Sequence, residues 1–242
     1  MNTKLGVGDF AVQSSSIVAF IGPVGVGKST QMRLLKHRLE SKNVKVVCTF
    51  IKSNHVFSFF LSRFLIFLGS KEIGSYPGGL VIVYPRRAIL RALFPLLCVL
   101  DAASIAIKFL FRVQIPFLFG STVLVEEGLL MTLFTYEVFY PRFFNTRPRM
   151  LPFVPRLLGW TMARNHKNIV LDAEDEELRL RRKQRSQRQN ELDEYVAEQR
   201  KWIGRLGFDH PAIINTTGKS VGAVHREILR TLDAQIPLEL MV

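Results

Sequence analysis

The feature that most constrains the fold of this chain is a glycine-rich octapeptide between an apolar run and a helical pattern. Residues 22–29 read Gly-Pro-Val-Gly-Val-Gly-Lys-Ser, directly after the apolar run 16–21 and before the helical apolar period of 32–39. Glycines let successive backbone N–H groups face one anion, and the following helix presents its positive dipole end to the same point. The pattern G-x-x-x-x-G-K-[ST] in this context predicts a phosphate-binding loop.

The side chains at the end of this loop have separate predicted roles. Lys28 is a point charge that can reach the outer phosphates, the Ser29 hydroxyl is placed to bind Mg²⁺, and Thr30 can donate to the inner phosphate. The predicted ligands are therefore ATP and Mg²⁺. The residues predicted to bind the phosphates are Gly22, Val24, Gly25, Val26, Gly27, Lys28, Ser29 and Thr30.

The rest of the chain supplies the strands and helices of an α/β fold. A second β-branched run, 44–50, completes a strand, loop, helix, strand unit of the parallel kind, for which a right-handed crossover is expected. Further apolar strands are predicted at 121–125, 169–171 and 212–214, which makes five in all. Helices are predicted at 56–68, 87–111 and 221–232, with a turn at 76–79 between the first two. No linker divides the chain, so residues 1–242 are expected to form one domain.

Carboxylates end two of the predicted strands. Glu126 and Glu127 follow the strand 121–125, where a phosphate-binding loop needs an acid near its metal. Because neighbouring strand residues point to opposite faces, we expect one glutamate, Glu126, to face Mg²⁺ with Ser29, and the other to pack or form an ion pair. Asp172, after the strand 169–171, is predicted to cap the following helix.

An arginine-rich segment lies within a charged, helix-favouring stretch, 174–206. Six cations occur among the ten residues 179–188. One interpretation is a lid that neutralises phosphate charge during phosphoryl transfer, with Arg182 and Arg185 on one helical face as the catalytic candidates. The alternative is a solvated charged face.

The composition does not by itself decide which partners the protein binds. The 242 residues carry a net charge of +13 and 19 phenylalanines. Such charge suits nucleic acid, an anionic membrane or phosphorylated small molecules. No run of about 18 apolar residues without charges is present, and no secretory signal pattern occurs, so a cytoplasmic protein is expected. We expect the apolar middle of the chain to be buried, a homodimer interface being the intermediate case, and Cys48 and Cys98 to be buried thiols.

With these residues identified, the chain resembles the thymidylate kinase group of nucleoside monophosphate kinases, particularly its divergent archaeal-type members. The resemblance rests on 22–31 followed by Leu34-Leu35, and more loosely on 93–120, 171–185 and 214–220. It implies a P-loop NTPase fold, with a five-stranded parallel sheet in the order 2-3-1-4-5 between helices, and an arginine-rich lid within 174–206. In the family the loop before the last helix lies beside adenine, which implies base binding by Thr217, Gly218 and Lys219. Dimers are also typical of the family.

One departure from that family changes the expected acceptor. The family's third strand usually ends in an Asp-Arg pair, whereas the corresponding residues here are Glu126 and Glu127. A carboxylate in place of a cation should repel an acceptor phosphate unless Lys52, Arg86, Arg87 or Arg91 compensates. A neutral hydroxyl acceptor would tolerate two glutamates, and one of them could accept its proton.

The leading hypothesis is therefore an ATP- and Mg²⁺-dependent kinase for a nucleotide, nucleoside or other small acceptor, with Lys28, Glu126, Glu127, Arg182 and Arg185 as its catalytic residues. The alternatives are an ATP-binding protein whose acceptor site has decayed, and a nucleic-acid-linked ATPase or polynucleotide 5′-hydroxyl kinase. Membrane association is the least favoured partner hypothesis.

Overall fold

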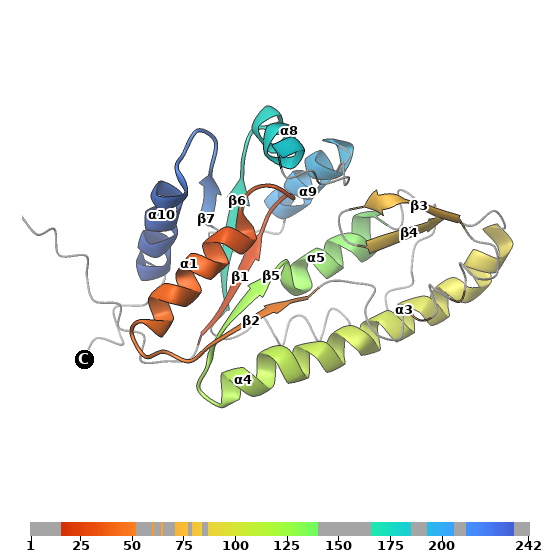
Figure 1. Ribbon diagram of the computed structural model, residues 1–242. Coiled ribbons are helices and arrows are strands. Elements are labelled where there is room, and N and C mark those ends of the chain that lie inside the picture. Colours follow the sequence, from red (N-terminus) through yellow and green to blue (C-terminus); the bar gives the residue numbers. More distant parts are fainter. Residues whose placement is uncertain are drawn as a thin grey trace, which may run out of the picture.

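A five-stranded parallel sheet forms the centre of the protein (Figure 1). The computed structural model describes residues 16–51, 60, 64, 71–76, 79–83, 87–139, 166–184, 193–205 and 212–234. The sheet has the order β2-β5-β1-β6-β7, and each neighbouring pair is parallel. Counted along the chain this is 2-3-1-4-5, so the predicted order is confirmed. The strands are β1 Ile17–Ile21, β2 Val46–Phe50, β5 Thr122–Glu126, β6 His166–Asp172 and β7 Ala212–Asn215.

Helices cover both faces of this sheet (Figure 1). On one face lie α1, Lys28–Glu40, and α10, Val221–Ala234. On the other lies a long helical stretch made of α3, Arg87–Phe109, a π-helical turn, Leu110–Gln114, and α4, Ile115–Leu118. The remaining helical segments are α5 Gly128–Phe134, a second π-helical turn at Thr135–Phe139, α8 Asp175–Gln184 and α9 Asp193–Arg205.

Alternation along β1 builds a separate core on each face. Val18 and Phe20 belong to a cluster with α1, α8, α9 and α10, whereas Ile17 and Ala19 belong to a cluster with α3. Successive strand residues point to opposite faces, so an uninterrupted apolar strand is what a sheet covered on both sides requires. The predicted phosphate-binding loop therefore follows a strand that is buried on both of its faces.

Two short strands were not predicted. β3, Lys71–Tyr76, and β4, Gly79–Val83, pair antiparallel on either side of the predicted turn at 76–79. The turn prediction located the reversal but missed the strands, because Lys71–Tyr76 contains no continuous apolar run and the glycine and proline signal dominated the interpretation of this segment. Of the predicted helix 56–68, only Phe60 and Phe64 lie within the described residues, and both are helical.

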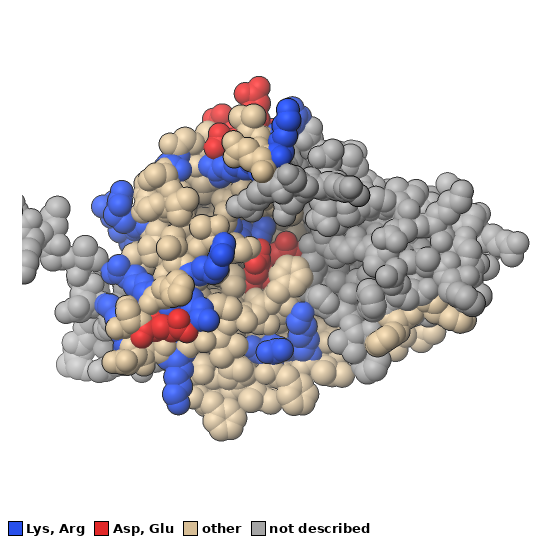
Figure 2. Space-filling model, viewed as in Figure 1, with Lys and Arg blue, Asp and Glu red and all other residues tan. Residues whose placement is uncertain are grey.

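The expectation that this long helical stretch is largely buried is wrong for its outer face. Its inner face packs on the sheet through Ile105, Phe109 and Val113. Its outer face leaves large apolar side chains in solvent, and in Figure 2 the lower edge of the molecule, over α3 and α4, shows basic but no acidic side chains. We call this set the α3–α4 apolar face: Leu96, Val99, Ile107, Leu110, Phe111, Leu118 and Phe119.

Two further findings concern the exposure of Cys48 and the possibility of a membrane-spanning helix. Cys48 is exposed rather than buried, because β2 is an edge strand of the sheet. Within the part of the chain that the structure describes, no helix combines the length and apolar character needed to cross a membrane.

Candidate nucleotide-binding site

The loop between β1 and α1 depends on glycine at both of its ends. Gly27 caps α1 with φ 103°, in the left-handed region that favours glycine. Gly22 has φ 142°, and a Cβ atom there would lie 2.0 Å from the Leu171 carbonyl oxygen of β6. The loop thus passes directly against the backbone of the neighbouring strand, and any larger residue at position 22 would push it away from the sheet.

Lys28 is held within this loop. Its Nζ donates to the carbonyl oxygens of Gly22, at 2.6 Å, and Pro23, at 3.1 Å. The same ammonium lies 3.9 Å from Glu127 Oε1, and the Lys28 residue is only 5% exposed. A buried cation with these partners is a preorganised positive charge beside the backbone N–H groups of the loop.

Ser29, in the first turn of α1, and Glu126, the last residue of β5, come together beside the loop. In the sheet register Phe20 pairs with Glu126, so β5 ends level with the start of the loop. The Ser29 hydroxyl lies 2.9 Å from each carboxylate oxygen of Glu126. A hydroxyl and a carboxylate are the hard oxygen ligands that Mg²⁺ takes in phosphoryl-transfer sites, together with waters and phosphate oxygens. The donor set therefore fits Mg²⁺.

Glu127 does not continue the alternation of β5. The strand ends at Glu126, and Glu127 has φ 69° and ψ −46°, while its N–H donates to the Phe20 carbonyl at 2.9 Å. A non-glycine residue in this region carries backbone strain of about 1–3 kcal/mol, which persists only where the surroundings hold it. Because of this turn both carboxylates face the loop: Glu126 reaches Ser29, and Glu127 reaches Lys28.

The loop between β7 and α10 is held by its own polar groups. Thr217 donates its backbone N–H to the Asn215 side chain, at 2.9 Å, and its hydroxyl accepts the N–H of Glu174, at 2.8 Å. Gly218 has φ 65°, and nothing lies within 4 Å of where its Cβ would stand. Lys219 pairs with Glu227 at 2.7 Å. The three residues to which the resemblance gave base binding thus form a turn beside the start of α8, with Thr217 partly buried and Gly218 and Lys219 exposed.

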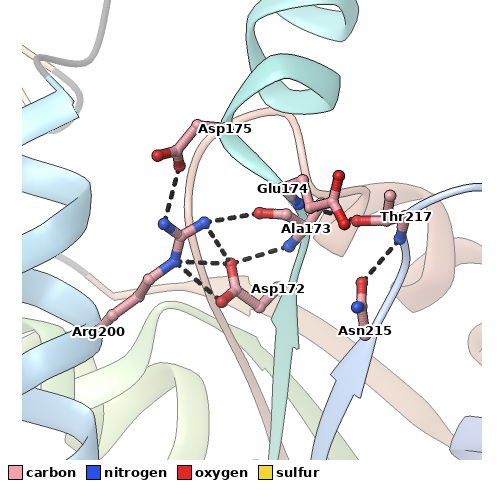
Figure 3. A network of polar contacts seen from close by, with 7 residues as sticks. All are labelled: Asp172, Ala173, Glu174, Asp175, Arg200, Asn215 and Thr217. Atoms are coloured by element: carbon pink, nitrogen blue, oxygen red, sulfur yellow. Dashed lines mark hydrogen bonds and ion pairs between the residues drawn. The ribbon is translucent and has the colours of Figure 1, made fainter.

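Arg200 of α9 joins the ends of β6 and α8 (Figure 3). Its guanidinium forms hydrogen bonds to Asp172, the shortest at 2.9 Å, to Asp175 at 2.8 Å, and to the Ala173 carbonyl at 2.6 Å. Burial by itself would lower the pKa of Arg200, but the two aspartates outweigh it, and the pKa lies above its ordinary value. The guanidinium of Arg200 therefore remains charged at every pH at which the protein is folded and active.

This network corrects the prediction for Asp172. Its carboxylate accepts the N–H of Ala173, at 2.8 Å, and binds Arg200, rather than capping α8. Asp172 is still the last residue of β6, and α8 begins only at Asp175, so its side chain lies too early in the chain to reach the free N–H groups of that helix.

Replacing Arg200 with methionine is expected to lower the free energy of unfolding by about 1–3 kcal/mol, because two aspartates and a backbone carbonyl lose a charged partner. The measurement is urea unfolding followed by circular dichroism. Lys201→Met is the matched control, since Lys201 is an exposed cation on the same helix. A loss no larger than that of the control would show that the network does not stabilise this end of the sheet.

The arginine-rich segment is divided between described and undescribed residues. Arg181, which was not singled out as a catalytic residue, donates to the Thr216 hydroxyl and carbonyl, both at 3.0 Å, and pairs with Glu177. Arg182 lies on α8, and Arg185 lies outside the described residues. The Glu177 and Arg181 pair was visible at i, i+4 spacing, whereas the contact with Thr216 crosses 35 positions and has no local signal.

Comparison with solved structures assigns the fold. The protein is similar to the thymidylate kinase of Ehrlichia chaffeensis, with a TM-score of 0.50 and 15% sequence identity, over 91% of this chain and 99% of the other. It is also similar to the thymidylate kinase of Candida albicans, with a TM-score of 0.53 and 14% identity, over 91% and 92% of the two chains.

Both neighbours have a thymidylate kinase fold. The protein therefore has a thymidylate kinase-like P-loop NTPase fold, as its sheet order and loop indicate. No family model matches the sequence, and no curated protein does. The similarity is thus one of fold, and what the site does is argued from its own residues.

Proposed function

We propose that this protein is an ATP- and Mg²⁺-dependent kinase, formed by residues 1–242 as one domain, that transfers a phosphoryl group to a small hydroxyl acceptor. The observation that carries the proposal is the meeting of Lys28, Ser29, Glu126 and Glu127 at one loop, with a buried ammonium, a hydroxyl and two carboxylates. The thymidylate kinase-like fold supports it, because both structural neighbours are thymidylate kinases.

Each of these residues has a role in the proposed reaction. The N–H groups from Gly22 to Thr30 and the Lys28 ammonium would bind the phosphates of ATP. Ser29 and Glu126 would hold Mg²⁺, which when bound supplies positive charge to the phosphate oxygens. Thr217, Gly218 and Lys219 would lie at the base, and the segment 174–206, with Arg182 and Arg185, would cover the nucleotide as a lid.

Glu127 is the proposed general base. In the transfer, the acceptor hydroxyl oxygen forms a bond to the γ-phosphorus, the bond from that phosphorus to the bridging oxygen of ADP breaks, and the hydroxyl proton passes to Glu127. Its buried carboxylate beside Lys28 is positioned next to the loop that would hold the γ-phosphate.

The two carboxylates favour a neutral acceptor over a phosphorylated one. A nucleotide acceptor would bring negative charge towards Glu126 and Glu127, in a site of low effective dielectric constant where repulsion is strong. The cations suggested to compensate have no described side chains: Lys52 and Arg86 lie outside the described residues, and Arg87 and Arg91 lie on α3 without described surroundings. Because two carboxylates face the loop, a nucleoside or another small alcohol is the proposed acceptor class.

The test is ADP formation from ATP and Mg²⁺ with a panel of acceptors. The panel contains nucleosides, sugar alcohols, thymidine monophosphate and an oligonucleotide with a free 5′-hydroxyl. We expect ADP release above the acceptor-free rate, with a phosphorylated product, for at least one uncharged small alcohol and a lower kcat/KM for thymidine monophosphate. A higher kcat/KM for the nucleotide would contradict the proposed acceptor class, and turnover confined to the oligonucleotide would favour the polynucleotide kinase hypothesis.

One observation favours a second candidate, an ATP-binding protein without transfer activity. The Glu127 carboxylate lies beside the Lys28 ammonium, so it offsets part of the positive charge that the loop offers to phosphate. This candidate predicts saturable ATP binding with no acceptor-dependent ADP release anywhere in the panel.

A further inference from the structure

Gln31 joins the start of α1 to the start of α10, and these two helices lie side by side on one face of the sheet (Figure 1). It follows Thr30 directly, and its backbone N–H donates to the Gly27 carbonyl at 3.0 Å. Its side-chain Nε2 donates to the Val221 carbonyl, at 2.9 Å, and its Oε1 lies 3.2 Å from His225 Nδ1. One residue therefore connects the glycine-rich loop to the first two turns of α10, 190 and 194 positions further along the chain.

Both polar atoms of this buried amide have a partner. Only 3% of Gln31 is exposed. Because the amide oxygen can only accept, His225 Nδ1 carries the proton in their contact. A side chain that merely filled this space would be apolar, as Met32, Leu35 and Val224 in the core cluster shared by the two helices are. Hydrogen bonds are directional and apolar packing is not, so the amide fixes the position of α10 along α1.

The turn 216–220 is fixed at both of its ends. At its last residue the Ser220 hydroxyl accepts the N–H of Ala223, at 3.3 Å, within the first turn of α10. At its first residue the Thr216 N–H donates to the Asp172 carbonyl of β6, at 2.7 Å. One end of the turn is thus held by the sheet, and the other is held by α10, the helix that the buried amide positions against α1.

The spacing between this turn and the glycine-rich loop matters for a ligand that reaches both. The inference below rests on the proposed function, in which the phosphates of ATP bind at 22–30 and its base lies at 217–219. A ligand that bridges two subsites gains from the second only where the distance between them matches its own length. Holding that distance before the ligand arrives also lowers the ordering cost of binding.

We propose that Gln31 is a positioning residue that sets the affinity for ATP by holding the turn 216–220 at a fixed distance from the loop 22–30. Its buried side chain is directed at α10, so it acts through the turn and not by touching the nucleotide. A ligand that has phosphates but no base should therefore bind independently of this residue.

The test is isothermal titration of the full chain with two ligands, ATP and inorganic tripolyphosphate, each with Mg²⁺. Gln31→Met removes both side-chain hydrogen bonds and keeps an unbranched side chain that favours a helix. We expect the Kd for ATP to rise by at least about tenfold, while the Kd for tripolyphosphate changes by less than about twofold. A purely structural role would not change the ratio of the two constants.

His225 offers a second pair of variants that leaves α1 unaltered. His225→Leu removes the donor to Gln31 and should raise the Kd for ATP by about threefold or more. His225→Asn keeps a side-chain N–H near the position of Nδ1, so it should retain the parent affinity. In the Gln31→Met background both changes should have no further effect, because the acceptor of that hydrogen bond is gone.

Ile228→Val is the matched control for stability. Ile228 is a fully buried residue of α10 in the core cluster that also contains residues of α1. Removing one of its methyl groups should lower the temperature of thermal unfolding and leave the ratio of the two dissociation constants unchanged. This control separates a loss of stability from a change in the distance between the two subsites.

Two results would overturn the positioning role and leave the ATP site intact. Equal loss of affinity for both ligands in Gln31→Met would make the residue a support of the loop or of the whole fold. An unchanged Kd for ATP in folded Gln31→Met would show that the spacing does not depend on it. A parent chain that binds neither ligand would instead overturn the proposed function, and this inference with it.

Discussion

Replacing Lys28 with alanine is expected to lower acceptor-dependent phosphoryl transfer by about 10²–10³-fold, the loss typical of removing one preorganised charge-stabilising donor. Lys28 is buried and already aimed into the loop by the carbonyls of Gly22 and Pro23. Its ammonium therefore needs little reorganisation when phosphate charge develops, and water in the variant cannot replace it at equal strength. The measurement is single-turnover transfer from ATP with an acceptor identified by the panel.

Lys36→Ala is the matched control for that experiment. Lys36 lies on the same helix, with 40% of its side chain exposed and an ion pair to Glu40 on the surface. Its loss should leave the rate within about twofold of the parent, since such pairs contribute little. If Lys28→Ala retained the parent rate while remaining folded, the loop would not be the site of phosphoryl transfer.

The second large effect is a difference between the kinetic consequences of replacing each of the two glutamates. Glu126→Gln is expected to raise the Mg²⁺ concentration needed for half-maximal activity by about 10–100-fold, because the Ser29 and Glu126 pair loses its charge. Glu127→Gln is expected to lower kcat by about 10²–10⁴-fold with little change in the Mg²⁺ requirement, because an amide cannot accept the hydroxyl proton. Steady-state kinetics across a Mg²⁺ titration measure both.

The pattern of these two variants distinguishes the proposed roles. Glu40→Gln removes an exposed carboxylate at the C-terminal end of α1, away from the loop, and serves as the control, with neither parameter expected to change. If both site variants altered the Mg²⁺ requirement equally, the two carboxylates would act as one metal site and Glu127 would not be the base. If Glu127→Gln left kcat unchanged, a different group or water would take the proton.

Much of the fold was predictable because its signals are local. The loop 22–29, the uninterrupted apolar run of β1 and the runs that became β2, β5, β6 and β7 are each recognised from a few consecutive residues. Packing on both faces of a parallel sheet demands continuous apolar strands, so these runs stand out against the charged stretches.

The failures have a different physical origin. β3 and β4 are held together by hydrogen bonds between the two strands, and the residues of either segment alone do not indicate this pairing. The outer face of α3 was expected to be buried because apolar periodicity alone does not say whether a partner is present. Asp172 was predicted to cap α8 because its partner Arg200 is 28 residues away in the chain.

The sequence by itself determined the glycine-rich loop 22–29, the parallel sheet and the residue types available for chemistry, since each follows from short-range patterns of glycine, charge and apolar spacing. Only the tertiary structure decided that Glu127 leaves the strand and reaches Lys28, that Arg181 joins α8 to the loop before α10 while Arg200 joins α9 to the end of β6, and that one side of α3 and α4 faces outward. Those features depend on which distant elements pack together, and that information is distributed over the whole chain.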